Sequence, residues 1–349
     1  MRVLHVIAHF DRGGSELQLA GLIRAAHGVH WDATLCVLNP GYPLAHELHE
    51  QGIPLVELEQ RRRRDLGRVA RLRSTIRAGG FDVVHSTLWR GSLVARAAAS
   101  FRGRPAVVMA ERAAEWFRPA RERAVDHVLR RVTDRYVGNS EAVKEFICWA
   151  HGVGPDRVAV IGNAVDDTVF HPGPTSPRTV ARIGSVGRLA TQKGYDVLLA
   201  ALPAVLARRP VEVEIVGAGE QEGALRRQAG ALPVRFAGRI DDQGEVAAFL
   251  RGLDVFVLPT RFEGLPNSIL EARACGVPVV ATAAPGVAEA MPSGSHLVPI
   301  DDVPALAEAI LAALDGASSS ETLRPPSFDD VARSHLEVFQ AAVHQRRAR

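Results

Sequence analysis

The first half of the chain alternates short, uniformly apolar runs with longer segments in which apolar residues recur every three to four positions. The short runs have the length of buried β-strands, and the longer segments have the period of α-helices. This alternation predicts an α/β domain over residues 1–170, with a parallel sheet covered on both faces. The predicted strands are residues 3–7, 34–38, 83–85, 106–110, 135–137 and 158–161, and the predicted helices are residues 16–26, 68–77, 93–101, 120–133 and 140–151.

The same alternation starts again after residues 171–179, whose proline, glycine, serine and threonine are typical of a linker. We expect a second domain at residues 171–327 and a last helix, residues 328–349, that packs back on the first domain. Two doubly wound, Rossmann-like domains would face a cleft at the C-terminal ends of their strands. The strands predicted here are residues 182–186, 211–216, 234–237, 255–258 and 279–281, and the helices are residues 195–207, 221–229, 243–250, 303–314 and one that begins at Pro266.

The composition is that of a soluble globular enzyme and argues against several other classes of protein. Of the 349 residues, 47% are hydrophobic and 23% are charged. Because the apolar runs have only the length of strands, we expect neither a transmembrane helix nor a signal peptide. Cys36, Cys148 and Cys275 are scattered and lack metal-ligand spacing, so the sequence predicts no disulfide framework and no metal site, and it favours the cytoplasm.

The net charge of +3 is small, but one basic run precedes a predicted helix at Arg61, Arg62, Arg63 and Arg64. Two interpretations remain for this run. It is either a solvated charged face or a surface that holds the first domain peripherally on the inner face of an anionic membrane. Aromatic residues make up only 5% of the chain, so stacking on bases has little support and we expect no nucleic-acid partner.

The stretch of residues 261–280 places Glu263 and Glu271 on either side of a loop-to-helix junction. Pro266 suits a first helical position, where no N–H group is lost. The N–H groups of residues 264–267 then form a natural anion site at the helix N-terminus. Carboxylates beside such a site accept hydrogen bonds from sugar hydroxyls, so this stretch predicts a ligand with both phosphate and polyol groups.

The loop of residues 187–194 carries Arg188 and Lys193 directly after a predicted strand. The chain has only one other lysine, Lys144, so a lysine in this loop is unusual. One guanidinium and one ammonium aimed into the cleft would suit a diphosphate. The alternative interpretation is two solvated cations on a loop.

Two positions of the first half are also candidates for ligand contact. Gly13 and Gly14 follow the first strand and would allow close approach of backbone to a phosphate, although a flexible turn fits equally well. His85 ends a predicted strand, where it would bind a sugar hydroxyl or steady developing charge. A histidine that is satisfied by neighbouring backbone is the alternative at that position.

A glycine pattern in the second half suggests a different enzyme class. Gly217, Gly219 and Gly223 follow a predicted strand, and Asp241 lies where a ribose-binding acid of a dinucleotide fold would be. This pattern would fit an NAD(P)-dependent oxidoreductase. Two glutamates in the same loop oppose pyrophosphate binding, and too little chain follows for a full dinucleotide fold with a catalytic domain.

Taken together, the motifs closely resemble the retaining nucleotide-sugar glycosyltransferases of family 4 over nearly the whole chain. The resemblance implies a GT-B fold, with an N-terminal acceptor domain and a C-terminal donor domain, and no required metal or other cofactor. The segments that carry the resemblance are GGSE, VIGNAVD, VGRLATQKG, VGAGEQEGALR, FAGRIDD and RFEGLPNSILEARACGVPVVAT.

The resemblance also implies roles for individual residues. Arg188 and Lys193 would hold the donor diphosphate, Glu263 the hydroxyls of the transferred sugar, and Glu271 those of the ribose. His85 would face the sugar near its reacting carbon. The remaining donor contacts implied by the family are Gly13, Gly14, Gly217, Arg239, Ile240, Gly264, Leu265, Pro266 and Asn267.

The chain departs from the family pattern at three places. Gly162 and Ala164 stand in a segment that usually reads VIPNGVD, Thr87 replaces a frequent second histidine, and the loop before Glu289 is altered. The expected function is transfer of a sugar from a UDP- or GDP-sugar to a hydroxyl of a lipid-linked or glycan acceptor. The rival hypotheses are the NAD(P)-dependent oxidoreductase and a non-catalytic, membrane-associated binding protein of the same fold.

Overall fold

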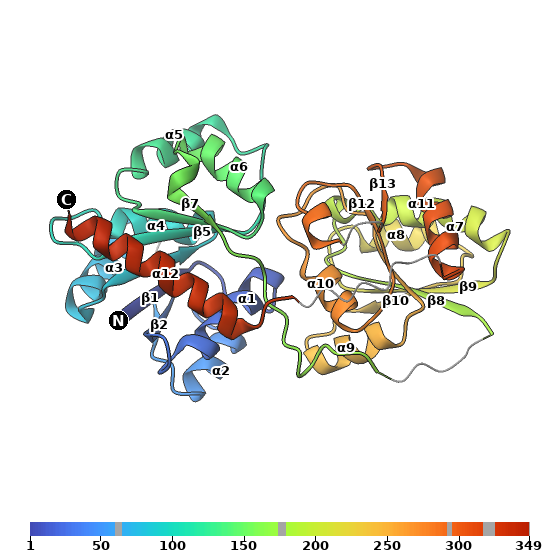
Figure 1. Ribbon diagram of the computed structural model, residues 1–349, viewed down its shortest axis with the longest axis horizontal. Helices are drawn as coiled ribbons and strands as arrows, with labels where there is room; N and C mark the ends of the chain where they lie inside the picture. The colour runs from blue at the N-terminus through green and yellow to red at the C-terminus, as the bar shows by residue number, and fades with distance from the viewer. Residues whose placement is uncertain (60–64, 174–178, 292–294, 317–324, 349) are drawn as a thin grey trace. The chain divides into compact units, whose positions relative to one another are not determined.

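The computed structural model describes residues 1–59, 65–173, 179–291, 295–316 and 325–348, which form two compact units (Figure 1). Unit 1 contains Met1–Ala164 and Pro326–Arg349, and unit 2 contains Val165–Pro325. The first boundary lies earlier than the expected residue 170. The reason is that Val165 and Phe170 are buried in a hydrophobic cluster of unit 2, so this part of the predicted first domain packs with the second.

The sheet of unit 1 has seven parallel strands in the order β3-β2-β1-β4-β5-β6-β7. The order reverses between β1 and β4, as in doubly wound folds. The strands are β1 (Arg2–Ile7), β2 (Asp32–Val37), β3 (Leu55–Glu57), β4 (Val83–Thr87), β5 (Ala106–Glu111), β6 (Arg135–Gly138) and β7 (Val158–Val160). The α-helices are α1 (Gly14–Ala26), α2 (Pro43–Glu50), α3 (Leu66–Gly79), α4 (Trp89–Ala98), α5 (Ala120–Leu129), α6 (Glu141–His151) and α12 (Phe328–Arg347).

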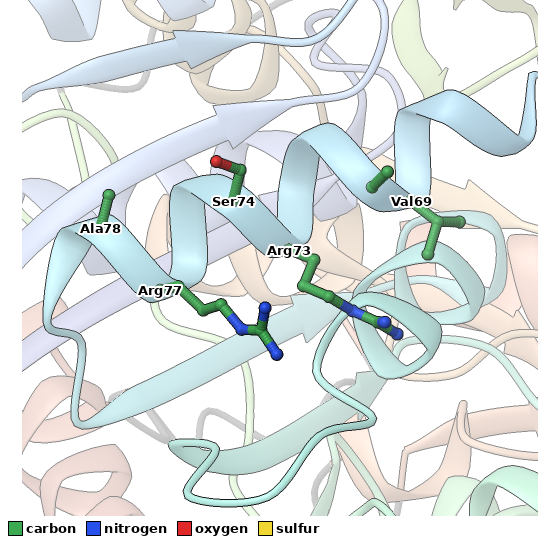
Figure 2. Close-up of a pocket in the computed structure, with 6 residues that line it drawn as sticks. Val69, Arg73, Ser74, Arg77 and Ala78 are labelled. Carbon is green, nitrogen blue, oxygen red and sulfur yellow. The ribbon is translucent and has the colours of Figure 1, made fainter.

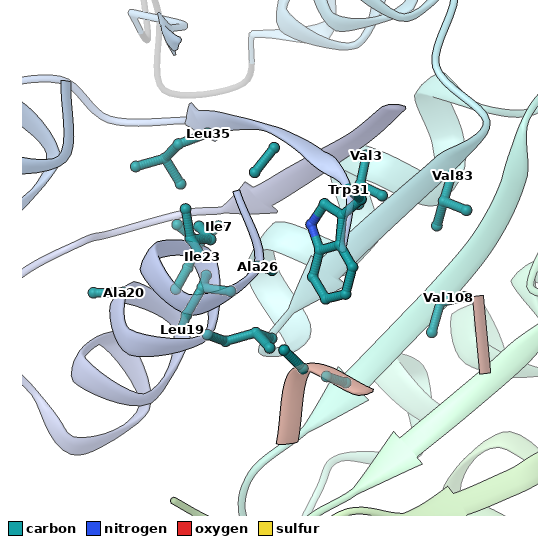
Figure 3. Packing of buried hydrophobic residues seen from close by; sticks show 14 of the residues in the cluster. Val3, Ile7, Leu19, Ala20, Ile23, Ala26, Trp31, Leu35, Val83 and Val108 are labelled. Atoms are coloured by element: carbon teal, nitrogen blue, oxygen red, sulfur yellow. The ribbon is translucent and has the colours of Figure 1, made fainter. Parts of the chain in front are cut away.

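Alternate residues of β1 supply the hydrophobic clusters on the two faces of this sheet. Val3 and Ile7 pack with residues of α1, α2 and α12, and Figure 3 shows this cluster around Trp31. Leu4 and Val6 pack on the opposite face with residues of α3 and α4. Burial of this central strand on both faces explains why its sequence is apolar apart from Arg2 at its start and His5.

The last helix, α12, packs on unit 1 against α1 and β5. It begins at a capping box, in which the Ser327 hydroxyl accepts a hydrogen bond from the Asp330 N–H and the Asp330 carboxylate accepts one from the Ser327 N–H. Phe328 occupies the space beside Gly21, where an added Cβ would lie 2.2 Å from the Phe328 ring. His335 and Phe339 are residues of α12 itself, and both are fully buried.

Unit 2 has a six-stranded parallel sheet in the order β10-β9-β8-β11-β12-β13. Its strands are β8 (Ala181–Val186), β9 (Val211–Val216), β10 (Val234–Gly238), β11 (Val255–Leu258), β12 (Val279–Thr282) and β13 (His296–Val298). Its α-helices are α7 (Tyr195–Leu206), α8 (Glu222–Ala229), α9 (Gln243–Arg251), α10 (Asn267–Ala274) and α11 (Val303–Leu314).

The observed elements differ from the predicted ones mainly where they are short. The sequence did not predict α2, β3 or β13, and the predicted helix of residues 93–101 begins earlier, at Trp89. Ser140 is the N-cap of α6, because its hydroxyl accepts a hydrogen bond from the Val143 N–H at 3.2 Å. None of the helices that the structure describes is long and apolar enough to cross a membrane.

Candidate functional site

The carboxyl ends of the unit 2 strands carry a set of loops that are bonded to one another. We call the loops after β8, β9, β10, β11 and β12 the unit 2 loop cluster. The Gly187 N–H donates to the Val216 carbonyl at 3.0 Å, and the Gly217 N–H donates to the Gly238 carbonyl at 2.8 Å. The Glu263 N–H in turn donates to the Pro285 carbonyl at 3.3 Å. Most of the predicted ligand contacts in unit 2 therefore lie on loops that are fixed relative to one another.

Close backbone packing explains the glycines that suggested a dinucleotide site. A Cβ on Gly217, whose φ is 148°, would lie 1.9 Å from the Gly187 carbonyl oxygen. A Cβ on Gly219 would lie 2.3 Å from the Leu189 carbonyl oxygen. These two glycines are required for the β8 and β9 loops to meet, so they need no pyrophosphate to account for them.

Lys193 and Glu263, which the sequence assigned to phosphate and sugar, form an ion pair with Nζ and Oε1 2.6 Å apart. Both side chains are largely buried, with 16% and 12% of their surface exposed. Glu263 Oε1 also accepts a hydrogen bond from the Thr260 hydroxyl at 3.1 Å. The approach depends on Gly194, because a Cβ there would lie 1.9 Å from the Pro259 carbonyl oxygen. The structure thus brings these two predicted residues together.

Arg261 connects the same two loops and was not among the predicted site residues. Its guanidinium donates to the Thr191 carbonyl at 2.6 Å, and it forms ion pairs with Asp196 at 2.7 Å and Asp301 at 2.8 Å. Its backbone N–H donates to the Gln192 carbonyl at 2.8 Å. Arg261 therefore holds the Lys193 loop against the Glu263 loop. The only signal in the sequence is an arginine two residues before Glu263.

Glu271 lies on α10, near the middle of the stretch of residues 261–280. The helix begins at Asn267 with Pro266 as its N-cap, one position later than predicted. Burial raises the pKa of the Glu271 carboxyl to about 7, while the charge of nearby Lys193 acts in the opposite direction. No hydrogen bond or ion pair joins this carboxyl to another residue of the described chain. It is available as an acceptor for ligand hydroxyls.

Arg188 and Arg239 are more open to solvent than the ion pair. The exposed Arg188 side chain has no hydrogen-bond or ion-pair partner in the described part of the chain, so its guanidinium is available to a ligand. Arg239 Nε lies 2.5 Å from Asp241 Oδ1, and Ile240 packs against the cluster that contains Ile269. Asp241, which the dinucleotide interpretation assigned to a ribose, is therefore already paired.

In unit 1, Gly13 and Gly14 lie at the start of α1. Gly13 is the N-cap and, as a glycine, has no side chain with which to cap the helix. The Glu16 carboxylate folds back over this end, since a Cβ on Gly13 would lie 2.5 Å from Glu16 Oε2. Burial raises the pKa of the Glu16 carboxyl. The start of α1 therefore suits a Glu16 carboxyl that is either protonated or paired with a hydrogen-bond donor.

His85 is not placed as its predicted sugar contact requires. Its side chain is fully buried in unit 1, with Nδ1 3.0 Å from Nδ1 of His5 and its ring beside His335. The side chain points to the face that α12 covers, so it does not reach a ligand. Thr87, two residues further along β4, is also fully buried.

One hollow of unit 1 lies on α3. It has a volume of about 670 Å³ and is lined by residues of α3 alone (Figure 2). Arg73 in this hollow donates to the Ala98 carbonyl at 3.1 Å, and Arg77 stacks on Phe101 at 4.7 Å. Both arginines are engaged in holding α3. The predicted membrane contact formed by Arg61, Arg62, Arg63 and Arg64 lies outside the described residues.

Within the described ranges, no group of three or more histidine, cysteine, aspartate or glutamate side chains is arranged to hold a metal ion. Cys36, Cys148 and Cys275 are free thiols.

Two family models match the chain, one in each unit. The model described as Glycosyltransferase Family 4 matches residues 12–169, and the model described as Glycosyl transferases group 1 matches residues 180–316. Together the two matches cover more than half of the chain.

Curated relatives match shorter parts. A Corynebacterium glutamicum GDP-mannose-dependent monoacylated alpha-(1-6)-phosphatidylinositol monomannoside mannosyltransferase is 35% identical over 171 residues, which are 46% of this chain and 43% of the relative. A Mycobacterium tuberculosis glycogen synthase is 32% identical over 256 residues, which are 69% of this chain and 62% of the relative. The chain thus spans less than two thirds of the length of these relatives.

Solved structures match over the full chain. Anabaena HepE, crystallised with UDP and glucose, has a TM-score of 0.78 and 21% identity, covering 100% of this chain and 98% of HepE. The lipopolysaccharide outer core galactosyltransferase WaaB has a TM-score of 0.73 and 17% identity, covering 99% and 100%. These likenesses confirm the predicted fold class, a GT-B protein with two Rossmann-like α/β domains.

Proposed function

The chain belongs to the family 4 and group 1 glycosyltransferases, and we propose that it moves a sugar from a UDP- or GDP-sugar to a hydroxyl of a lipid-linked or glycan acceptor. One observation carries the proposal. The Lys193–Glu263 ion pair lies on loops at the carboxyl ends of the unit 2 strands, and Glu271 on α10 is close enough for the charge of Lys193 to act on it. Relatives support the donor classes, because one is named as GDP-mannose-dependent and HepE was crystallised with UDP.

The proposed reaction needs cations at the leaving diphosphate. The bond from the sugar carbon to the diphosphate oxygen breaks, and a new bond forms to the acceptor oxygen on the same face of the sugar. The acceptor proton passes to a diphosphate oxygen. Arg188 and Lys193 stabilise the negative charge that develops as the diphosphate leaves, an effect that is strong in a site from which water is excluded. No metal or cofactor is included in this proposal.

The carboxylates would orient the donor. Glu263 already holds Lys193 in place, and its second oxygen would accept hydrogen bonds from hydroxyls of the transferred sugar. Glu271 would accept them from the ribose, which favours the ionised carboxyl over the protonated form. Gly217, Arg239 and Ile240 would border the nucleotide. The N-terminus of α10, after Gly264, Leu265 and Pro266 and starting at Asn267, would add the favourable end of the helix dipole.

The other parts of the hypothesis concern unit 1 and the location of the protein. Gly13 and Gly14 would approach the donor phosphates through backbone groups at the start of α1. We propose that the protein works in the cytoplasm, peripherally at the inner face of a membrane when its acceptor is lipid-linked. The three free thiols are compatible with a reducing compartment.

The oxidoreductase hypothesis gains no support from the relatives described above, and packing accounts for its glycines. Fluorescence titration with NADH, UDP and GDP compares the two hypotheses directly. We expect saturable binding of UDP or GDP and none of NADH. A non-catalytic binding protein would bind the nucleotide without releasing it from a nucleotide sugar.

The test of the proposed function is replacement of the ion pair. Lys193→Ala and Glu263→Ala should each lower the release of UDP or GDP from a nucleotide sugar, in the presence of a membrane extract, by roughly a hundredfold or more. Lys144 offers a matched control, because it is the other lysine and its Nζ also lies close to a carboxylate, 3.1 Å from Glu141 Oε2.

Lys144→Ala should leave turnover unchanged. Circular dichroism checks that all three variants remain folded. If Lys193→Ala and Glu263→Ala retain turnover close to that of the wild type, the assignment of this site is wrong.

A further inference from the structure

The Arg261 guanidinium is bonded to three different segments of unit 2. It donates to the Thr191 carbonyl at 2.6 Å, to the two oxygens of the Asp196 carboxylate at 3.1 and 2.7 Å, and to Asp301 Oδ1 at 2.8 Å. The first partner lies on a short 3-10 helix, η2 (Thr191–Lys193), the second in the first turn of α7, and the third in the turn after β13. A planar guanidinium suits this arrangement, because its N–H groups point in fixed directions. One side chain thus fixes three segments relative to one another.

The residues of η2 are also bonded individually to the loop after β11. The Gln192 carbonyl accepts a hydrogen bond from the Arg261 N–H at 2.8 Å, and the Gln192 side chain donates to the Phe262 carbonyl at 2.7 Å. Lys193 pairs with Glu263 of the same loop. The main chain of η2 and the ammonium of its last residue are therefore held from one side by consecutive residues.

Asp301 has an unusual backbone conformation. Its φ is 61°, and it is one of two non-glycine residues with a positive φ in the part of the chain that the structure describes. Aspartate tolerates this conformation better than most residues do, but the conformation remains unfavourable. Strained backbone of this kind persists where surrounding bonds hold it, and it is concentrated at functional sites. The hydrogen bond from Arg261 Nε is one such restraint.

These ion pairs contribute more to placement than to stability. The Asp196 and Asp301 side chains are 48% and 53% exposed. Ion pairs that are this open to water add little to the free energy of unfolding. Their convergence on one guanidinium nevertheless restricts where each of the three segments can lie. A need for precise geometry therefore explains the arrangement better than a need for stability does.

Arg261 differs in this respect from the cations assigned to the ligand. Its guanidinium makes four hydrogen bonds to protein acceptors, whereas that of Arg188 has no partner among the described residues. Lys193 has a flexible stem of four carbons, so the position of its ammonium depends on where η2 is held. A displacement of about 1 Å in such a group can cost roughly a hundredfold in rate. Arg261 can therefore influence the reaction through η2 without touching the donor.

We propose that Arg261 is a positioning residue of the sugar transfer, and that Asp196 and Asp301 are its anchors. Arg261 fixes η2 so that Lys193 lies where the leaving diphosphate gains negative charge. The inference rests on the proposed function, because Arg261 acts through the charge that Lys193 supplies to the transition state. It adds a contribution from the turn after β13, which carries none of the residues assigned to the donor.

The first test is Arg261→Ala, assayed as release of UDP or GDP from a nucleotide sugar in the presence of a membrane extract. We expect kcat to fall by roughly tenfold to a hundredfold. The KM for the nucleotide sugar should change by less than about threefold, because the lost positioning matters most as charge develops. Hydrogen–deuterium exchange of residues 190–194 should be faster in the variant than in the wild type.

A double variant shows whether Arg261 acts through Lys193. In a chain that already carries Lys193→Ala, the further change Arg261→Ala should lower kcat by less than about twofold. A residue with a merely structural role would lower kcat by the same factor in both backgrounds. Multiplication of the two single effects would therefore overturn the proposal.

Asp301→Asn separates the ion pair from the backbone strain. Asparagine also tolerates a positive φ, but it lacks the charge that Arg261 Nε meets. We expect kcat to fall by about threefold or more, with a smaller change in KM, because a charge-assisted hydrogen bond is weakened. A kcat equal to that of the wild type would overturn the role of Asp301.

Arg209 supplies the matched control. It lies just beyond the end of α7, whereas Asp196 lies at the start of that helix, and it donates to the Leu314 carbonyl at 3.0 Å and to Asp315 Oδ1 at 3.1 Å. Arg209 thus bonds to a main-chain carbonyl and a carboxylate of unit 2, as Arg261 does, but away from the unit 2 loop cluster. Arg209→Ala should keep the kcat of the wild type.

Circular dichroism measures the folded fraction of each variant. The proposal is overturned if Arg261→Ala also keeps the kcat of the wild type, or if its loss of kcat only equals its loss of folded protein. Lys193→Ala distinguishes this failure from that of the proposed function. If Lys193→Ala loses turnover and Arg261→Ala does not, the proposed function stands and this inference is wrong. If Lys193→Ala retains turnover, the proposed function is wrong and the inference is overturned with it.

Discussion

Unit 1 buries three imidazoles in contact with one another, and we predict that this cluster makes the unit sensitive to acid. His5 lies on β1, His85 on β4 and His335 on α12. Trp31 Nε1, which is only a donor, donates to His5 Nε2 at 3.1 Å. His5 must then carry its proton on Nδ1 and donate to His85 Nδ1 at 3.0 Å. A second proton on either ring would break one of these bonds.

The pKa values of the three imidazoles follow from this arrangement. Burial lowers the pKa of His5 to about 3 and that of His335 to about 4, with the neighbouring His335 and Arg112 respectively acting in the same direction. Burial, followed by the charges of His5, His335 and Arg112, lowers the pKa of His85 well below 6.5. All three rings therefore remain neutral in the folded state in the pH range near 6.5, where the same imidazoles begin to bind protons in the unfolded chain.

The sign and size of the effect can be worked out directly. Because the unfolded chain binds more protons below pH 6.5, the free energy of unfolding falls as the pH falls. At about pH 5.5 each imidazole contributes a loss of about 1.4 kcal/mol, and three give about 4 kcal/mol. This is a large fraction of the 5–15 kcal/mol that is roughly typical of a domain.

Urea denaturation followed by tryptophan emission is a suitable assay. Trp31, Trp89, Trp116 and Trp149 are the four tryptophans of the chain, and all belong to unit 1. Their emission therefore reports the unfolding of unit 1 without a contribution from unit 2. We expect the free energy of unfolding to be lower at about pH 5.5 than at about pH 7.5 by roughly 4 kcal/mol.

A variant isolates the cluster from other titrating groups. His335→Gln should reduce this pH-dependent loss by about 1.4 kcal/mol, whatever its effect on stability at neutral pH. His344, which is exposed on the same helix, is the control, and His344→Gln should leave the loss unchanged. An equal loss in the His335→Gln and His344→Gln variants would refute the reasoning, as would equal stability of the wild type at the two pH values.

Two further predictions concern unit 2. Because burial raises the pKa of Glu271 to about 7 and ribose hydroxyls need the ionised carboxyl, UDP or GDP should bind more weakly at about pH 6 than at about pH 8, by up to roughly tenfold. Calorimetry should show no such dependence for Glu271→Gln, and a dependence equal to that of the wild type would contradict this role. Gly217→Ala should cost unit 2 about 2 kcal/mol or more, because its Cβ meets a carbonyl. Gly238→Ala, at a φ of 79° in open space, should cost only about 1 kcal/mol. Both costs are measured by urea denaturation followed by circular dichroism, because unit 2 has no tryptophan, and equal costs would show that the contact with Gly187 is unimportant.

Both sheets could be predicted because most residues of their central strands are apolar and because the strands alternate with segments of helical period. The elements that escaped prediction lie mostly at the sheet edges. The edge strands β3 and β13 have only three residues each, which is too short for any periodicity. A short edge strand takes its conformation from pairing with its neighbour, and that neighbour is known only once the sheet is assembled.

The sequence assigned Lys193 and Glu263 to one site but did not predict the ion pair between them. They are separated by 70 residues, and their loops meet because β8 and β11 are neighbours in the sheet. The strand order of a doubly wound sheet brings such loops together at its carboxyl edge.

His85 shows that a sequence motif can give the position of a residue in the fold without giving its role. The sequence places it at the end of a predicted strand, and the structure extends that strand, β4, to Thr87. Whether it faces ligand or core depends on what covers that face of the sheet, and the cover is α12, which follows about 240 residues later and belongs to the same unit. Since His85 and Thr87 are both fully buried, any contact of unit 1 with a sugar must come from residues beyond the end of β4 or from other loops. Replacement of His85 would then alter catalysis only through the stability of unit 1. The property that identifies the role of His85 is therefore the acid sensitivity of the imidazole cluster, and not turnover.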